Sequence, residues 1–162
     1  MPAPTHALDL GSGGGVPGLA LAAAWPASRW VLLDASSRRG AFLEQVVVDL
    51  QLEGRVTVVV DRAEAAAREG RWRAAFEVVV ARSFGPPAVT AECAGGFLRV
   101  GGRLLVSEPP EDAPERWPDG PLAELGLVDR GRHGQVRILE QVTPTPDRFP
   151  RRVGIPAKRP LW

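Results

Sequence analysis

The chain has 162 residues, of which 44% are hydrophobic and 24% are charged, and its formal net charge is +1. This length suits one domain with a sizeable core, and the composition is typical of a globular cytoplasmic protein. No apolar run approaches the roughly 20 residues of a membrane span, and no secretory signal is visible. The single cysteine, Cys93, excludes an internal disulfide and a cysteine-cluster metal site.

Segments typical of strands and helices alternate along the chain. The continuous apolar run WVLLD indicates a strand buried on both faces, and the spacing of apolar residues from Phe42 to Leu50 is helical. The expected strands are His6–Leu10, Trp30–Asp34, Val56–Val60, Phe76–Arg82, Gly101–Glu108 and Val136–Val142. The expected helices are Pro17–Ala24, Ser36–Leu52, Ala63–Glu69, Ala88–Phe97 and Leu122–Leu125.

This alternation predicts a doubly wound, mostly parallel α/β sheet of about seven strands. We see neither an internal repeat nor a linker, so residues 1–162 are expected to form a single domain. The tail, about 143–162, is rich in Pro and Arg and is expected to be irregular.

The stretch LDLGSGGGVPG, from Leu8 to Gly18, contains five glycines directly after the first expected strand. Glycines allow a tight turn and a close approach of a ligand to the backbone. The next helix would point free N–H groups at the same place. Because doubly wound sheets bind ligands beyond the carboxyl ends of their strands, the loop predicts a nucleotide-type site. The alternative is a turn without a ligand.

Two carboxylates help to choose the nucleotide. Gly13, Gly15 and Gly18 match the GxGxxG pattern of a dinucleotide site, but this match alone is weak evidence. Asp34 ends the second strand and can accept hydrogen bonds from ribose hydroxyls of either cofactor. Asp9 would repel a pyrophosphate but suits the sulfonium and ammonium groups of S-adenosylmethionine. The pattern therefore favours S-adenosylmethionine, with a cap or loop carboxylate as the alternative for Asp9.

Five stretches, in order, carry a family resemblance: LDLGSGGGVPG, LLDASSRRGAFL, DRAE, VVVARSF and RFPRRVGIPAKRPL. With them the chain resembles the 16S rRNA guanine-N7 methyltransferases of the glucose-inhibited-division protein B family. The resemblance implies a Rossmann-like class I methyltransferase fold that binds S-adenosylmethionine. Besides Asp9 and Asp34, the resemblance implies cofactor contacts from Gly11, Ser12, Gly13, Val16, Ala63, Glu64 and Arg82. Of these, Ala63 and Glu64 would face the adenine.

The chemistry implied by the resemblance requires little acid–base help. Guanine N7 has an exposed lone pair and no proton, so the enzyme mainly aligns the nucleophile with the methyl group. Arg82, at the cofactor–substrate junction, would orient the guanine or a phosphate; its alternative is a salt bridge that fixes the loop. His6, His133 and Cys93 form no motif and are expected to be structural or solvated.

Basic residues suggest where RNA would bind. Arg38 and Arg39 stand where the family has a Lys-Arg pair. The tail holds five basic and no acidic residues from Arg148 to Arg159. Arg151 and Arg152 are therefore expected at phosphates, with Phe149 stacked on a base; a solvated basic tail is the alternative.

Three departures from the family pattern bear on the substrate. The family has a helical segment before the first strand, its serine after the second-strand acid is Ala35 here, and its Lys-Gly after the fifth strand is Glu108-Pro109. Glu108 is expected to repel phosphate. Without the extra helices, apolar surface near the first helix would remain, which predicts self-association or a partner.

The leading hypothesis is an S-adenosylmethionine-dependent methyltransferase that acts on ribosomal RNA or the small ribosomal subunit, with no membrane partner. One alternative is a divergent homologue that methylates another substrate. Another is a cofactor- or RNA-binding protein without turnover. An NAD-dependent oxidoreductase is disfavoured by Asp9.

Overall fold

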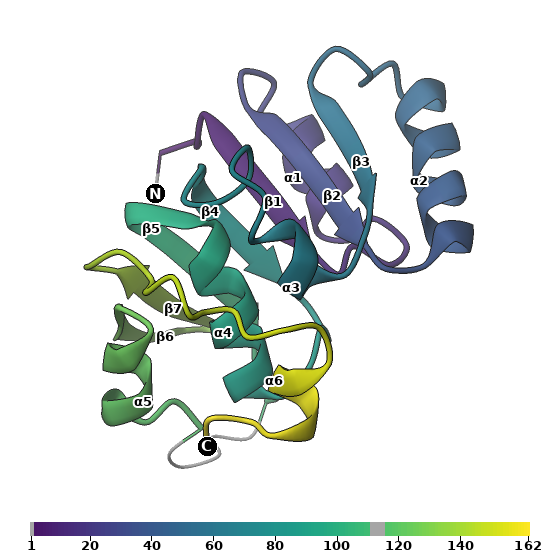
Figure 1. The fold of residues 1–162 in the computed structure, drawn as a ribbon. Coiled ribbons are helices and arrows are strands. Elements are labelled where there is room, and N and C mark those ends of the chain that lie inside the picture. Colours follow the sequence, from purple (N-terminus) through teal and green to yellow (C-terminus); the bar gives the residue numbers. More distant parts are fainter. Residues whose placement is uncertain (1, 111–115) are drawn as a thin grey trace.

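The computed structural model describes residues 2–110 and 116–162, and one seven-stranded sheet forms its centre (Figure 1). The strands are β1 (His6–Leu10), β2 (Arg29–Asp34), β3 (Val56–Val60), β4 (Phe76–Ala81), β5 (Leu98–Ser107), β6 (Leu127–His133) and β7 (Val136–Gln141). They are ordered β3-β2-β1-β4-β5-β7-β6. β1 to β5 are parallel, and β7 is antiparallel to both of its neighbours. The predicted fold class is confirmed.

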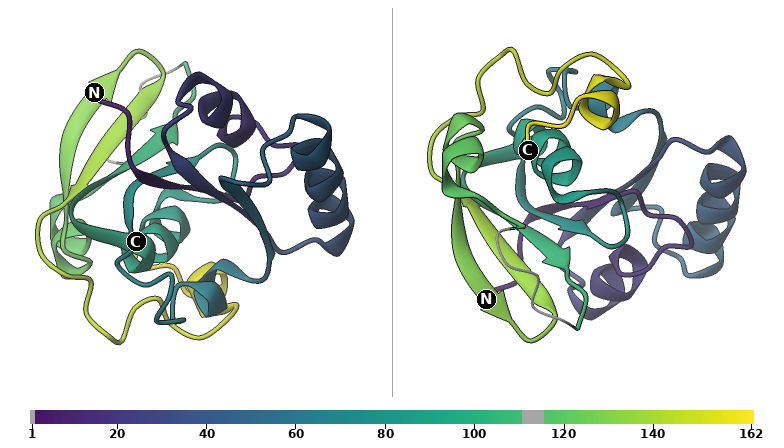
Figure 2. Two further views of the ribbon diagram at one scale, coloured as in Figure 1. Left: turned by 90° about the horizontal axis from the view of Figure 1, so that it is seen from above. Right: turned by 90° about the horizontal axis from the view of Figure 1, so that it is seen from below.

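Helices cover both faces of this sheet (Figure 2). Along β2 the side chains alternate: Leu32 packs into the core with the helices that flank β2, whereas Val31 and Leu33 pack into the core on the other face. Burial on both faces explains the continuous apolar run of this strand. The helices are α1 (Gly18–Ala24), α2 (Ser37–Asp49), α3 (Ala63–Ala66), α4 (Pro87–Phe97), α5 (Asp119–Glu124) and α6 (Ile155–Lys158).

The structure differs from the predicted elements at several bounds. β6 was not predicted, because its sequence LVDRGRH mixes charges with one glycine and its side chains are mostly half-exposed at the sheet edge. β5 starts at Leu98, so the expected turn at Gly101 lies inside a strand, at a register shift against β4. α3 ends at Ala66, three residues earlier than expected.

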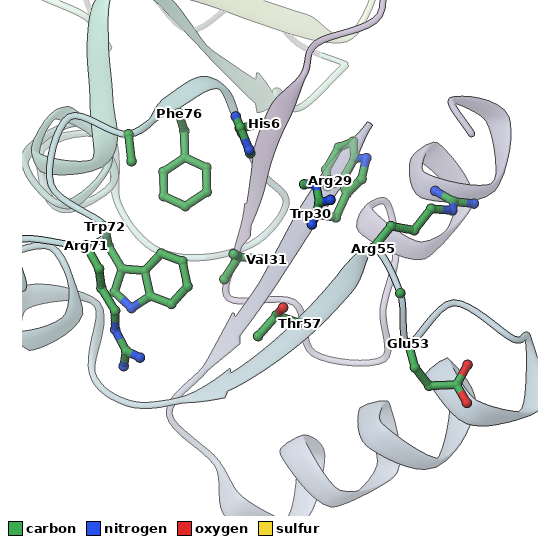
Figure 3. A pocket seen from close by; sticks show the side chains of 12 residues that line it. His6, Arg29, Trp30, Val31, Glu53, Arg55, Thr57, Arg71, Trp72 and Phe76 are labelled. Carbon is green, nitrogen blue, oxygen red and sulfur yellow. The ribbon is translucent and has the colours of Figure 1, made fainter. Parts of the chain in front are cut away.

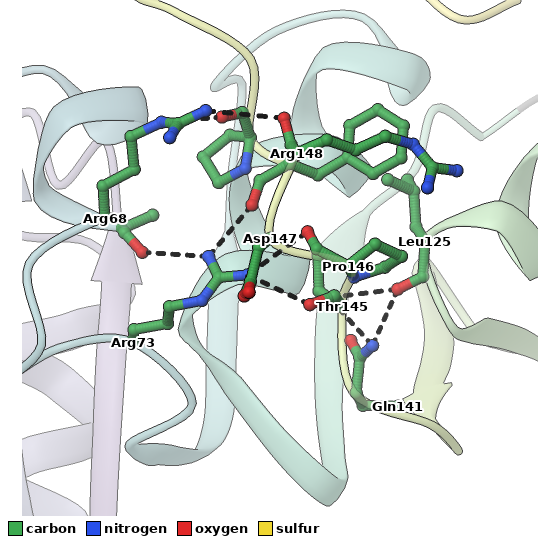
Figure 4. Close-up of polar contacts among 11 residues, drawn as sticks. Arg68, Arg73, Leu125, Gln141, Thr145, Pro146, Asp147 and Arg148 are labelled. Atoms are coloured by element: carbon green, nitrogen blue, oxygen red, sulfur yellow. Dashed lines mark hydrogen bonds and ion pairs between the residues drawn. The ribbon is translucent and has the colours of Figure 1, made fainter.

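The C-terminal segment, defined here as residues 143–162, is largely irregular as expected, but it is packed against the domain (Figure 4). Arg73 donates hydrogen bonds to the carbonyl oxygens of Thr145, Pro146 and Phe149, at 3.0, 3.2 and 2.9 Å. Phe149 is only 3% exposed and belongs to the core. The prediction that Phe149 stacks on a base is therefore wrong, because its ring is already buried.

A cavity of about 530 Å³ lies at the amino-terminal edge of the sheet (Figure 3). Trp72, Phe76 and Val31 contribute apolar walls, and His6 and Arg29 lie at the starts of β1 and β2. Elsewhere Phe42, Val48 and Leu50, on or next to α2, are each about half exposed. Self-association stays a prediction. Within the described ranges, no helix is both long and apolar enough to span a bilayer.

Candidate functional site

The carboxyl ends of the parallel strands meet at one edge of the sheet, where strand order reverses beside β1. This is the place at which doubly wound sheets bind ligands. A cavity of about 240 Å³ opens there. The glycine loop, the end of β2, the start of α3 and the loop after β4 supply its walls, among them Gly11, Asp34, Ala35, Asp61, Ala63, Glu64 and Phe84.

The glycine loop is held against β2 by its backbone. The N–H groups of Gly11 and Ser12 both donate to the carbonyl oxygen of Leu33, each at 2.9 Å. Gly11 has φ +73°, and a Cβ there would lie 2.7 Å from Cδ2 of Phe84. A side chain would therefore strain the turn and displace the ring. Glycine at this position lets the backbone itself form the cavity wall.

Asp9 lies beneath the loop. It is 1% exposed, and its Oδ2 accepts a hydrogen bond from the N–H of Gly18 at 2.9 Å. Burial raises the pKa of Asp9 to about 6, although the Gly18 N–H opposes this shift. Ser12 also points inward, because its hydroxyl donates to the Asp9 carbonyl oxygen. In the described structure neither residue lines the cavity, so the observed contact of Asp9 is that of a loop carboxylate.

Asp34 faces the cavity from the end of β2 and is 6% exposed. Its Oδ2 accepts from the N–H of Gly13 and its Oδ1 from the N–H of Ser36, both at 2.9 Å. Arg39 lies 3.5 Å from Oδ2 but is 63% exposed. Asp34 therefore shapes the glycine loop as well as the cavity. Arg38 and Arg39 border a neighbouring hollow beside Gly13.

Glu64 occupies the opposite wall, in α3, and is 3% exposed. Its Oε1 accepts from the N–H of Gly154 at 3.0 Å and from Nη2 of Arg62 at 3.1 Å. Burial alone would raise the pKa of Glu64, but these donors hold it below its ordinary value. Glu64 is thus an ionised hydrogen-bond acceptor at the cavity. Ala157, from the C-terminal segment, lines the same cavity, and sequence reasoning missed it.

A second cavity, of about 350 Å³, lies at the ends of β4 and β5 and shares Phe84 with the first. Glu108 lines it and is 9% exposed. Its Oε1 accepts from Nε1 of Trp117 at 3.2 Å, and its Oε2 lies 3.4 Å from Nε of Arg116. Arg116 therefore offsets part of the charge of this largely buried carboxylate, and the expectation that Glu108 repels phosphate stays a prediction.

The remaining predicted residues are less enclosed. Val16 is 54% exposed and does not line the first cavity. Arg152 and Arg82 are also exposed. In the parts of the chain that the structure describes, Arg82 forms no hydrogen bond or ion pair. The alternative, a salt bridge of Arg82 that fixes the loop, is therefore not observed among these residues. Arg151, by contrast, is bound by Glu92 through several hydrogen bonds.

Known proteins similar to this chain are ribosomal RNA methyltransferases. Residues 3–113 match the family model GidB, described as rRNA small subunit methyltransferase G. A ribosomal RNA small subunit methyltransferase G from Parasynechococcus marenigrum is 35% identical, with 96% of this chain and 67% of the relative aligned. One from Chloroflexus aggregans is 34% identical, with 98% and 71% aligned. The chain thus spans about two thirds of the length of these relatives.

Solved structures share the fold at low sequence identity. An O-methyltransferase family protein from Burkholderia thailandensis matches with a TM-score of 0.65 and 16% identity, over 86% of this chain and 51% of that one. PKMT2 from Rickettsia typhi in complex with AdoHcy matches with a TM-score of 0.52 and 18% identity, over 64% and 20%. The chain therefore belongs to the GidB family of S-adenosylmethionine-dependent methyltransferases.

Proposed function

We propose that this chain transfers the methyl group of S-adenosylmethionine to N7 of a guanine in 16S rRNA. The observation that carries the proposal is the pair of adjacent cavities that share Phe84. One of them has acceptors suited to an adenosine, and the other is large enough for a single base. A methyl donor in the first, which we call the cofactor-side cavity, would lie beside a nucleophile in the second.

The first cavity has polar groups that would complement those of an adenosine. The Asp34 carboxylate is assigned to the ribose hydroxyls, and the Glu64 carboxylate to the amino group of the adenine. Gly11 and Ala63 supply close-packed backbone on either side. Asp9, from beneath the loop, acts on the positive sulfonium and ammonium groups through its charge rather than by contact.

In the second cavity, Glu108 is assigned to the guanine. The Watson–Crick edge of guanine carries N–H donors, and an ionised carboxylate only accepts hydrogen bonds. This contact would turn N7, on the other edge of the base, toward the cofactor. The exposed cations Arg38, Arg39, Arg82 and Arg152 are assigned to phosphates.

The reaction is an in-line displacement. The N7 lone pair forms a bond to the methyl carbon, the carbon–sulfur bond breaks with its electrons going to sulfur, and S-adenosylhomocysteine leaves. The guanine ring gains the positive charge that the sulfonium loses. No proton moves, so the side chains mainly bind and align the two reactants.

The direct test is methyl transfer to small ribosomal subunits, and to naked 16S rRNA, that lack the modification. We expect the wild-type protein to incorporate one methyl group, mapped to a guanine N7. Tight binding of S-adenosylhomocysteine with no transfer to either substrate would reject the RNA assignment and favour a divergent methyltransferase or a non-catalytic binding protein.

Cys93→Ser and His133→Ala are expected to lose less than a hundredfold in rate, because the reaction needs neither a base nor a covalent nucleophile. Burial raises the pKa of the Cys93 thiol, so the reactive thiolate is suppressed although Cys93 borders the cofactor-side cavity. Methylation rates should be compared at equal folded fraction, measured by circular dichroism. A larger loss in either folded variant would mean acid–base or covalent catalysis.

Arg38→Ala and Arg152→Ala are expected to weaken RNA binding, each by removing one phosphate contact. Each should flatten the dependence of log affinity on log salt concentration by about 0.7. Binding to a 16S rRNA fragment is measured by fluorescence anisotropy over a salt series. Arg99→Ala is the matched control, because this exposed arginine pairs with Glu77 at the opposite edge of the sheet. Equal slopes for all three variants would remove Arg38 and Arg152 from the interface.

A further inference from the structure

Arg73, Arg68 and Glu92 are among the side chains that attach the C-terminal segment to the domain. Arg73 donates to carbonyl oxygens near its start, as described above, and Arg68 donates from Nε to the carbonyl oxygen of Pro150 at 3.0 Å (Figure 4). The third is Glu92 of α4, which is completely buried. Because these contacts all use fixed backbone or buried partners, the segment has a defined path rather than that of a solvated basic tail.

The contact between Glu92 and Arg151 is the tightest of these. Oε1 of Glu92 accepts from the backbone N–H of Arg151 at 2.7 Å and from its Nε at 3.0 Å, while Oε2 accepts from Nη2 at 2.7 Å. A forked pair of this kind fixes orientation as well as distance. The same hydrogen bonds leave the Arg151 guanidinium committed to the protein, whereas Arg152, next in the chain, is exposed.

Three residues after this anchor, the chain contacts Glu64 in the wall of the cofactor-side cavity. The N–H of Gly154 donates to Oε1 of Glu64, and Ala157 forms part of the wall. Gly154 adopts φ +80°, a conformation that favours glycine. The other donor to Oε1, from Arg62, belongs to a side chain that is 52% exposed. The Gly154 amide is the better-fixed of the two.

We infer that the C-terminal segment positions the cofactor: the Glu92–Arg151 pair holds the Gly154 amide against Glu64, so that Oε2 of Glu64 receives the amino group of the adenine. Arg151 is thus a positioning residue, not a phosphate contact. The inference rests on the proposed place of the adenine beside Glu64. The lowered pKa of Glu64 is consistent with it, because burial alone would raise this pKa and the Gly154 N–H lowers it.

The test compares two ligands that differ at the adenine amino group, S-adenosylhomocysteine and S-inosylhomocysteine. Calorimetric titration of the full chain should give about tenfold or greater preference for the adenosyl compound, the usual effect of one hydrogen bond to a charged acceptor. Arg151→Lys keeps the charge but loses the fork. It should weaken binding of S-adenosylhomocysteine about five- to tenfold and reduce the preference between the ligands. Arg151→Gln, which removes the charge, should leave the salt dependence of RNA binding unchanged.

A double-mutant cycle separates positioning from general damage. If Arg151 acts through Glu64, then Arg151→Lys should have little further effect in a Glu64→Gln background. Arg71→Ala is the matched control, because Arg71 is 66% exposed, contacts Glu69 and the ring of Trp72, and does not line the cavity beside Glu64. Should Arg151→Lys fail to fold, Arg73→Lys tests the same segment from its other anchor.

The outcomes distinguish failure of this inference from failure of the proposed function. Unchanged ligand preference in Arg151→Lys and in Arg73→Lys, together with a flatter salt dependence for Arg151→Gln, would overturn the inference and return Arg151 to the RNA. Additive effects in the cycle would also overturn it. Failure of the wild-type protein to bind S-adenosylhomocysteine would instead reject the proposed function itself.

Discussion

Asp9→Asn is expected to stabilise the unliganded protein at neutral pH. Burial raises the pKa of Asp9 from 3.8 to about 6, so the folded state holds this proton more tightly than the unfolded chain does. The protonated Asp9 therefore contributes to the stability of the folded state in full below pH 3.8, and this contribution is lost as the pH rises through about 6. Ionising Asp9 at neutral pH therefore costs about 3 kcal/mol of stability. Asparagine does not ionise, and its carbonyl oxygen can still accept from Gly18.

The measurement is the unfolding temperature of the unliganded protein between pH 4 and pH 8. The advantage of Asp9→Asn should be largest at pH 8 and should vanish toward pH 4. Asp49→Asn, which changes an exposed carboxylate on α2, is the control and should show no such trend. A variant that is less stable than wild type at pH 8 would contradict the raised pKa.

The same substitution should weaken binding of the cofactor. S-adenosylmethionine has a sulfonium that S-adenosylhomocysteine lacks, so the loss of the Asp9 charge should reduce affinity for the first more than for the second. The protein would then keep a buried charge that costs stability because the positive cofactor needs it, a trade-off known for functional sites. Equal losses for both ligands would mean that Asp9 serves only to hold the loop.

Asp34→Ala is expected to reduce affinity for S-adenosylhomocysteine by about 1–3 kcal/mol, or about 5- to 150-fold, the cost of losing hydrogen bonds to a charged acceptor. The effect has two sources, since the carboxylate is assigned to the ribose and also holds the N–H of Gly13. Asp34→Asn keeps one acceptor oxygen and should fall between alanine and wild type. Affinity is measured by calorimetric titration.

A control for this series is available in the same loop region. Asp61 also borders the cavity, but its Oδ1 accepts from the N–H of Arg62 directly before α3. Asp61→Asn should therefore change affinity less than Asp34→Ala does. If Asp34→Ala binds S-adenosylhomocysteine as tightly as wild type, the ribose assignment of Asp34 is wrong.

The sequence by itself determined the parts that depend on local pattern. Apolar runs such as WVLLD and the helical spacing from Phe42 to Leu50 follow from burial periodicity, which neighbouring residues alone express. The glycine loop could also be identified from its sequence. The structure gives the steric reason for two of its glycines, because a Cβ at Gly11 would collide with Phe84 and one at Gly18 with Asp9. Fold class and the edge of the sheet that carries the site followed from these patterns.

Only the tertiary structure decided what the charged residues do. Glu64 meets Gly154 across 90 residues of sequence, Glu92 meets Arg151 across 59, and Arg73 meets Phe149 across 76. A run of arginines predicts RNA when their partners are unknown, but folding placed the buried carboxylate of Glu92 beside one of them, Arg151. The energy of a charge is set by its surroundings, and residues distant in sequence supply those surroundings.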